Sequence, residues 1–300
     1  MKNKILGANI SVAISKTFSG LNMNALKFLL PLWMSALTGA TMRCVFAAVA
    51  FWIIALFLPA EKTVAPKEKW LLLLLGAVGL YGFMFFYLLG LSKTTPISSS
   101  IFISLQPIWV FLIMIFFFKE RVTTGKVVGI SIGLAGALVC ILTQRSDDLA
   151  SDAFVGNLLC LISSIVYAIY LVMSQRLLSS AGPLTMLKYT FTGASVSGII
   201  VLFFYGFDAP VLSLPIHWAP LLTLLFVLIF PTVISYLLMF NGLKHLKTTL
   251  VAIYGYLILI VATITSYILG QDRFNWTQLF AIALIFVGVY LVEVAESKDK

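Results

Sequence analysis

Ten apolar blocks, each long enough to cross a bilayer, follow one another along this chain with short connections between them. A helix needs about 20 apolar residues to span roughly 30 Å of hydrocarbon. The blocks lie near residues 5–25, 31–58, 69–91, 96–118, 124–144, 154–178, 184–206, 218–243, 248–269 and 276–294. With 61% hydrophobic and 10% charged residues, the 300-residue chain has too little polar surface to cover a water-soluble globule. The sequence therefore predicts an all-α integral membrane protein with ten transmembrane helices.

The basic residues are distributed unevenly about these blocks. Of the twenty Lys and Arg residues, thirteen fall on the side of the N-terminus and the even-numbered connections, four on the other side, and three inside the blocks. An excess of Lys and Arg marks the cytoplasmic side of membrane proteins. We therefore expect both termini and the cluster KER at 119–121 to be cytoplasmic, in a multi-pass protein of the cell (cytoplasmic) membrane. The same placement accounts for the net charge of +9 without a nucleic-acid partner.

An internal repeat relates the two halves of the chain through a shift of 152 residues. The shift aligns proline, acidic, arginine and glycine residues: Pro31 with Pro183, Glu120 with Asp272, Arg121 with Arg273 and Gly136 with Gly288. The repeat predicts two five-helix units, at 1–148 and 149–300. Because an odd number of spans ends on the opposite side, the second unit enters the bilayer with inverted topology, and QDR at 271–273 is expected outside. Inverted repeats of this kind build secondary transporters.

The repeat contains a recognisable motif at 90–139, GLSKTTPISSSIFISLQPIWVFLIMIFFFKERVTTGKVVGISIGLAGALV. The S-L-Q-P-x-W core, the K-E-R turn and the glycine-rich helix after it resemble the EamA-like family of the drug/metabolite transporter superfamily, and the resemblance covers essentially the whole chain. It implies transport of small metabolites such as amino acids and related solutes. It also implies a cavity lined by helices 1 to 4 and 6 to 9, with helices 5 and 10 at the periphery.

Two basic residues lie deep inside predicted spans. Lys16 is about eleven residues into the first span, roughly 16 Å at the helical rise, and Arg43 is about as deep in the second. A cation at the bilayer centre costs about 2.5 to 3.5 kcal/mol, so each needs water, a carbonyl cluster or an anion. All eleven acidic residues fall in loops, turns or the C-terminal tail region. We predict a positively charged cavity for a solute with a carboxylate or other anionic group, with bracing of Arg43 against backbone carbonyls as the alternative.

Polar faces on other predicted helices supply further substrate-binding candidates. The first helix carries a polar half-face, and the sixth carries Ser and Tyr residues at helical spacing. Such faces need water, a solute or another polar helix inside a bilayer. The candidates from these faces and from helices 8 and 9 are Ser15, Tyr167, Tyr170, Tyr236 and Tyr254. Hydrogen bonding between helices without a role in transport is the alternative for each of them.

The fourth predicted helix is interrupted by a Gln-Pro pair. Proline removes one backbone hydrogen bond, so Pro107 predicts either a hinge or a static kink. The amide of Gln106 is predicted either to bind substrate or to form a hydrogen bond with a neighbouring helix. In the second half the shift puts Ile258-Leu259 at these positions and Ser195 at that of Arg43, so an asymmetric site is expected.

Glycines at intervals of four form a smooth face on the fifth predicted helix. Gly125, Gly129 and Gly133 are followed by Ala137, which predicts close approach of another helix and leaves a homodimer open.

No catalytic, metal-binding or cofactor motif accompanies these features. The two histidines are far apart in sequence, and paired carboxylates within the spans are absent. A small-molecule substrate and the lipid bilayer are the predicted partners. Three alternatives remain, namely an exporter of drugs or other lipophilic solutes, a membrane-embedded enzyme and a channel.

Overall fold

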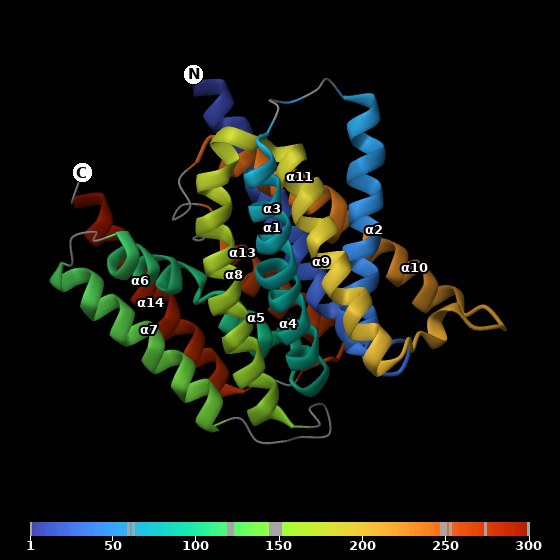
Figure 1. The fold of residues 1–300 in the computed structure, drawn as a ribbon. Coiled ribbons are helices and arrows are strands. Elements are labelled where there is room, and N and C mark those ends of the chain that lie inside the picture. Colours follow the sequence, from blue (N-terminus) through green and yellow to red (C-terminus); the bar gives the residue numbers. More distant parts are fainter. Residues whose placement is uncertain are drawn as a thin grey trace.

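The computed structural model describes residues 2–58, 61, 64–118, 123–143, 152–246, 251, 254–272 and 275–298, and no strand occurs among them. The clusters KER and QDR lie wholly or partly outside these residues. The helices are α1 (Lys2–Leu29), α2 (Ala36–Phe57), α3 (Pro66–Leu74), η1 (Leu75–Leu80), α4 (Tyr81–Lys93), α5 (Pro96–Ile103), α6 (Gln106–Phe118), α7 (Thr124–Thr143), α8 (Ala153–Ala181), α9 (Pro183–Tyr205), η2 (Pro210–Leu212), α10 (Trp218–Val227), η3 (Leu228–Ile234), α11 (Ser235–Leu243), α13 (Gly255–Ile268) and α14 (Trp276–Lys298). Figure 1 shows their arrangement.

Within the described residues, six helical runs are long and apolar enough to cross a membrane: Ala36–Phe57, Pro66–Lys93, Pro96–Phe117, Ala153–Ala181, Pro183–Tyr205 and Trp218–Leu243. Helices α1, α7, α13 and α14 lie outside this set. Length and composition thus define a multi-pass, all-helical membrane protein and leave the count of ten spans a prediction.

The second helix begins later than its apolar block suggests. The block starts at Pro31, whereas α2 starts at Ala36, after a turn through residues 30–34. The hydroxyl of Ser35 caps the new start by accepting a hydrogen bond from the backbone N–H of Thr38 at 3.2 Å. Arg43 therefore lies seven residues after the start of its helix, and the expectation of about eleven was wrong.

Irregular backbone recurs at equivalent places in the two halves. The π-helical runs η1 and η3 interrupt the third and eighth apolar blocks, and a shift of 152 carries residues 75–80 onto 227–232. In the fourth and ninth blocks, Leu105 N–H donates to Phe102 O at 3.2 Å, and Leu257 N–H donates to Tyr254 O at 3.1 Å. These tightened turns are also 152 residues apart. The internal repeat is therefore visible in backbone defects as well as in residue identity.

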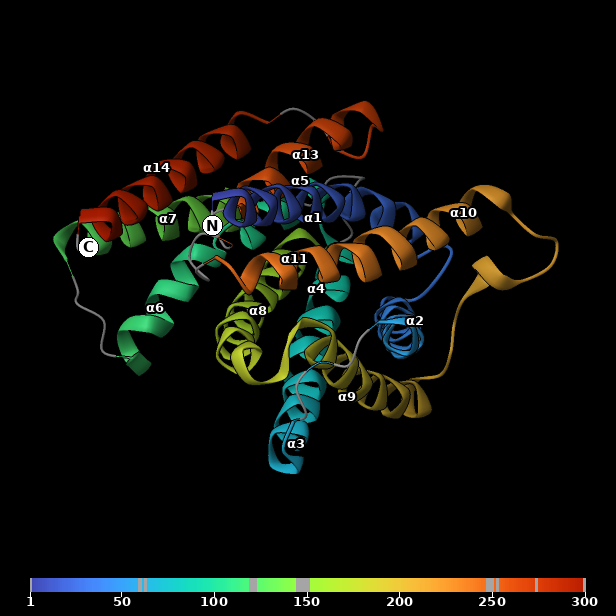
Figure 2. The ribbon, with the colours of Figure 1, turned by 90° about the horizontal axis from the view of Figure 1, so that it is seen from above.

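The packing of helices against one another also reflects the internal repeat. Helix α2 packs on α9, α7 on α14 and α5 on α13, and each pair joins equivalent blocks of the two halves. The pair α4 with α8 corresponds in the same way to the pair α11 with α1. Figure 2 shows α7 and α14 side by side at one edge, away from α2 and α9. This position agrees with the peripheral placement that the resemblance implied for helices 5 and 10.

The glycine face of α7 is occupied by α14 of the same chain. A Cβ built on Gly288 would meet the backbone of Gly133 and of Gly129, and one built on Gly136 would meet the carbonyl oxygen of Ala281. The predicted close approach of a helix is confirmed. Because α14 covers it, this face is not open to a second copy of the chain.

Glycine also permits the crossing of α9 over η1. A Cβ on Gly76 would collide with the carbonyl group of Thr190, and a Cβ on Gly193 would collide with that of Leu73. Each helix thus presents a glycine to the backbone of the other. This contact holds η1, the π-helical run of the third apolar block, directly against α9, the helix of the seventh block.

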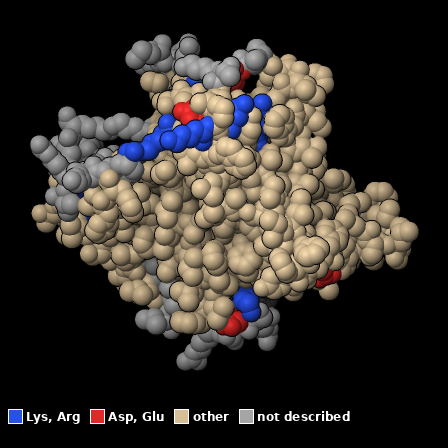
Figure 3. Space-filling model, viewed as in Figure 1, with Lys and Arg blue, Asp and Glu red and all other residues tan. Residues whose placement is uncertain are grey.

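The end of the bundle that contains the start of α3 carries most of the visible charge. In Figure 3, Lys and Arg side chains gather there, and only a few charged atoms lie at the opposite end. The carboxylate of Glu61 accepts hydrogen bonds from the backbone N–H groups of Leu184, at 3.2 Å, and Thr185, at 2.7 Å. An anion at a helix N-terminus is favourable, so Glu61 fixes the start of α9 beside that of α3.

Candidate functional site

A small cavity lined mostly by buried residues lies among α1, α2, α4, α5, α8, η3, α11 and α13. Its volume is about 50 Å³, which is room for a few water molecules. Four of the predicted residues do line it: Lys16, Arg43, Tyr167 and Tyr236. Of the described residues that line it, none is acidic. The cavity therefore contains two cations and no carboxylate to neutralise them.

Lys16 enters this cavity from the centre of α1. Its side chain is 2% exposed, and its Nζ lies 5.7 Å from the centroid of the Tyr167 ring on α8. A cation over an aromatic face gains about 0.5 to 2 kcal/mol, more when desolvated. That attraction offsets only part of the cost of burying the charge. The ammonium group of Lys16 can therefore still be stabilised by binding an anion.

Arg43 is anchored at one nitrogen and unpartnered at another. Its Nε donates to the hydroxyl of Thr232 at 2.9 Å, and that hydroxyl donates in turn to the carbonyl of Val227 at 2.7 Å. Its Nη1 is buried without a hydrogen-bond partner. The side chain thus braces against η3 through a threonine hydroxyl, instead of against backbone carbonyls, and retains a buried donor. Leaving such a charged donor unsatisfied is costly unless a ligand or water completes it.

Ser15 does not line the cavity but is bonded to a residue that does. Its hydroxyl donates to Ser235 O at 2.8 Å, and the hydroxyl of Ser235 donates back to Ser15 O at 2.9 Å. Ser235 itself lines the cavity. The reciprocal bonds tie α1 to α11, which is the interhelical role that sequence reasoning left open for the polar face of the first helix.

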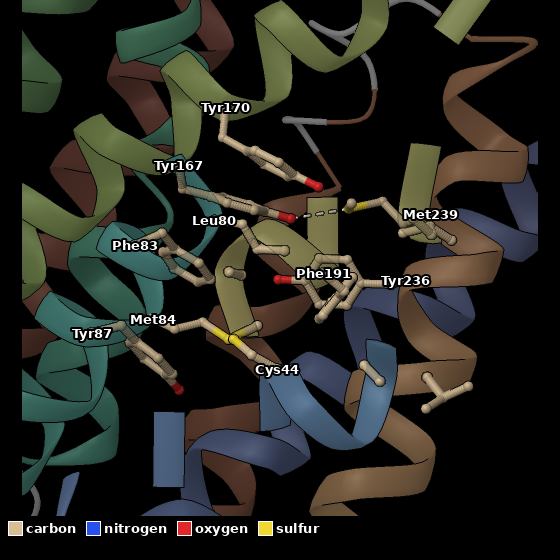
Figure 4. Packing of buried hydrophobic residues seen from close by; sticks show 14 of the residues in the cluster. Cys44, Leu80, Phe83, Met84, Tyr87, Tyr167, Tyr170, Phe191, Tyr236 and Met239 are labelled. Carbon is tan, nitrogen blue, oxygen red and sulfur yellow. Dashed lines mark hydrogen bonds between the residues drawn. The ribbon is translucent and has the colours of Figure 1, made fainter. Parts of the chain in front are cut away.

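The tyrosines predicted for the site divide into two groups. Figure 4 shows the hydroxyl of Tyr167 directed at Met239 of α11, with an oxygen to sulfur distance of 3.0 Å, and Tyr236 nearby. Tyr170 is fully buried beside Tyr167 but does not line the cavity. Tyr254 lies apart from it and donates to Asn9 Oδ1 at 2.9 Å.

Gln106 and Pro107 lie at the break between α5 and α6. Helix α5 ends at Ile103, and α6 begins at Gln106 after two residues of turn. Gln106 is fully buried, and neither Oε1 nor Nε2 has a hydrogen-bond partner. It faces the start of α13 at Gly255, outside the cavity lining. The predicted interruption is present, while a hinge motion stays a prediction.

Sequence reasoning missed the contribution of the third block. Phe83 and Tyr87 of α4 line the cavity, as do Met23 and Ile258. Phe83, Tyr87 and Ile258 lie in apolar stretches, where no polar periodicity singles them out. Tyr87 was the one that polarity could have indicated, because a tyrosine hydroxyl inside a span needs a partner.

An all-helical bundle with bilayer-length apolar helices around a buried cationic cavity is the architecture of a multi-pass membrane protein. The sequence model of the EamA-like transporter family matches residues 6–142 and again 154–294. The chain belongs to the EamA-like transporter family.

Relatives of the chain have names in the same class. An uncharacterized transporter of Bacillus subtilis, YyaM, is 25% identical over 91% of this chain and 88% of its own length. An uncharacterized transporter of Archaeoglobus fulgidus is 27% identical over 94% of this chain and 97% of its own. A solved structure titled "Crystal structure of protein" has a TM-score of 0.65 and 19% identity, over 100% of this chain and 99% of that one, and so shares the fold. Family and names indicate a transporter and not an enzyme.

Proposed function

We propose that this protein is a secondary transporter that moves a small metabolite with an anionic group, such as an amino acid, an organic acid or a related solute, by alternating access. The observation that carries the proposal is the pair of buried cations, Lys16 and Arg43, in a cavity whose described lining holds no acid. A carboxylate would satisfy the Nη1 of Arg43 and compensate both charges. The same potential disfavours lipophilic cations, which separates this proposal from an exporter of cationic drugs.

Alternating access is supported by the burial of the cavity lining and by the pairing of equivalent helices from the two halves. The cavity is small, at about 50 Å³, and Lys16 and Arg43 are almost fully buried, so solute entry requires helices to move. The backbone irregularities at η1, η3 and the α5–α6 break are places where a helix can bend. We assign ten spans in two inverted repeats, 1–148 and 149–300, with Pro107 as a hinge.

Comparison of metabolites in cells with and without the protein tests the proposed function. We expect one or more anionic metabolites to change in distribution between cell and medium, and the purified protein to move the same compounds in proteoliposomes. The flux should saturate and should accelerate when unlabelled compound is present on the opposite side. Flux without saturation or countertransport would indicate a channel, and movement confined to lipophilic cations would indicate a drug exporter.

Both termini and the start of α3 are proposed to face the cytoplasm, and the loop between α9 and α10 the outside. We expect Leu214→Cys to react with a membrane-impermeant maleimide in intact spheroplasts, in a variant without the native cysteines. Lys67→Cys should react only after lysis. Leu214 is 83% exposed and Lys67 is also exposed, so access to the reagent depends on the side of the membrane. The reverse labelling pattern would contradict the orientation.

A further inference from the structure

Two cavity-lining side chains present buried atoms without hydrogen-bond partners, and the two atoms are of opposite kind. Among the described residues that line the cavity, these atoms are Nη1 of Arg43, a cationic donor, and Oδ1 of Asn22, a neutral acceptor. Burying either atom unsatisfied is costly, and more so for the charged donor. The cavity therefore suits a molecule that carries a hydrogen-bond acceptor at one point and a donor at another.

Asn22 is a buried amide on the cavity side of α1. The residue is 5% exposed, and it lines the cavity together with Tyr87 of α4. Its Oδ1 has no hydrogen-bond partner. Asn22 lies six residues after Lys16 on α1, and both residues line the cavity.

We propose that Asn22 determines the specificity of the site by selecting solutes that carry a hydrogen-bond donor on the carbon beside their carboxylate. The proposal rests on the proposed function, because it assumes that Arg43 holds the carboxylate. Arg43 and Asn22 line the same small cavity, so we infer that the groups they bind lie close together on the solute. An ammonium or hydroxyl group next to the carboxylate meets this condition. A plain carboxylic acid leaves Oδ1 buried and unsatisfied.

Matched sets of acids test this selection with purified protein in detergent. One set is alanine, lactate and propionate, and the other is leucine, hydroxyisocaproate and isocaproate. Affinity is measured from the rise in the thermal denaturation midpoint with ligand concentration. In the native protein we expect the amino or the hydroxy acid of at least one set to bind about tenfold or more tightly than the plain acid. Which of the two binds identifies the donor as ammonium or hydroxyl.

In Asn22→Leu the preference should fall to about one, while the affinity for the plain acid is kept. Asn22→Ala has the same expected result and serves if the leucine variant fails to fold. The matched control is Asn24→Leu, because Asn24 is also buried on α1 with an unpartnered Oδ1 but lines a groove against α10 and α13 instead of the cavity. Its preference should equal that of the native protein.

Two results would overturn the proposal while leaving the anion site intact. These are equal affinity for all members of both sets in the native protein, and a preference retained in a folded Asn22 variant. If none of the six compounds changes the midpoint, the selection by Asn22 is rejected. The anionic-solute proposal then falls only if the flux measurements also show no anionic substrate.

Discussion

Replacing Arg43 by Gln should lower the affinity for carboxylate solutes by at least about thirtyfold, since removing one partner of a buried charge pair costs about 2 to 5 kcal/mol. The substitution keeps a polar side chain but removes the charge and the donor at Nη1, which has no protein partner. The measurement is the same thermal titration with lactate and alanine, followed by the concentration dependence of flux in proteoliposomes. Lys16→Gln should weaken binding in the same direction.

Lys188→Gln is the matched control for Arg43→Gln. Lys188 is also a basic residue within an apolar helix, but its Nζ lies 4.8 Å from the centroid of the Trp52 ring, outside the cavity lining. Its loss should leave the affinity for carboxylates unchanged. Native affinity in folded Arg43→Gln and Lys16→Gln would remove the anionic site from the proposal.

Introducing a methyl group at Gly76 should destabilise the protein strongly. The new Cβ would collide with the backbone carbonyl of Thr190, and a backbone, unlike a side chain, cannot turn aside. Overpacking costs about 1 to 3 kcal/mol and occasionally more, so we expect Gly76→Ala to lower the denaturation midpoint by on the order of 5 °C and to reduce the folded yield. Gly193→Ala, against Leu73, should have a similar effect.

Gly82→Ala provides the comparison on the same helical run. There a Cβ would lie 3.6 Å from Val166 Cγ1, which is ordinary van der Waals contact. The higher helix propensity of alanine should make this substitution neutral or slightly stabilising. A midpoint for Gly76→Ala equal to that of Gly82→Ala would show that α9 and η1 do not cross as closely as described.

Periodicity and charge in the sequence locate the helices because membrane insertion depends on the same quantities. The eighth block, predicted at 218–243, is helical over those same residues, and the first, sixth and tenth differ from their helices by a few residues at the ends. The late start of α2 was not predictable, because the residues after Pro31 are as apolar as the helix itself. The tightened turns follow from tertiary packing, so only Pro107 gave a sign of one.

The candidate site was predictable where polarity is rare. Lys16 and Arg43 stand out because each is a charge in an apolar block, and both line the cavity. Thr232 does not stand out, because single hydroxyl residues are common in such helices, and Asn22 was visible only as a member of the polar half-face of the first helix. The role of Thr232 depends on its contact with Arg43, which is far away in sequence, and the role of Asn22 depends on its place in the cavity lining. Tyr254 and Gln106 carried the same polarity signal and lie outside the lining, so polarity alone does not separate cavity residues from those that join helices.

The enclosure of Lys16 and Arg43 also decides how ionic strength acts on this molecule. Dissolved salt screens exposed charges over a Debye length of about 8 Å at physiological concentration, and it screens buried charges much less. The exposed Lys67 at the end of the bundle therefore loses its attraction for anions as salt rises. The two cavity cations, at 2% and 3% exposure, keep theirs. Capture of a solute at the membrane surface and its retention in the cavity thus respond differently to the same change in the medium.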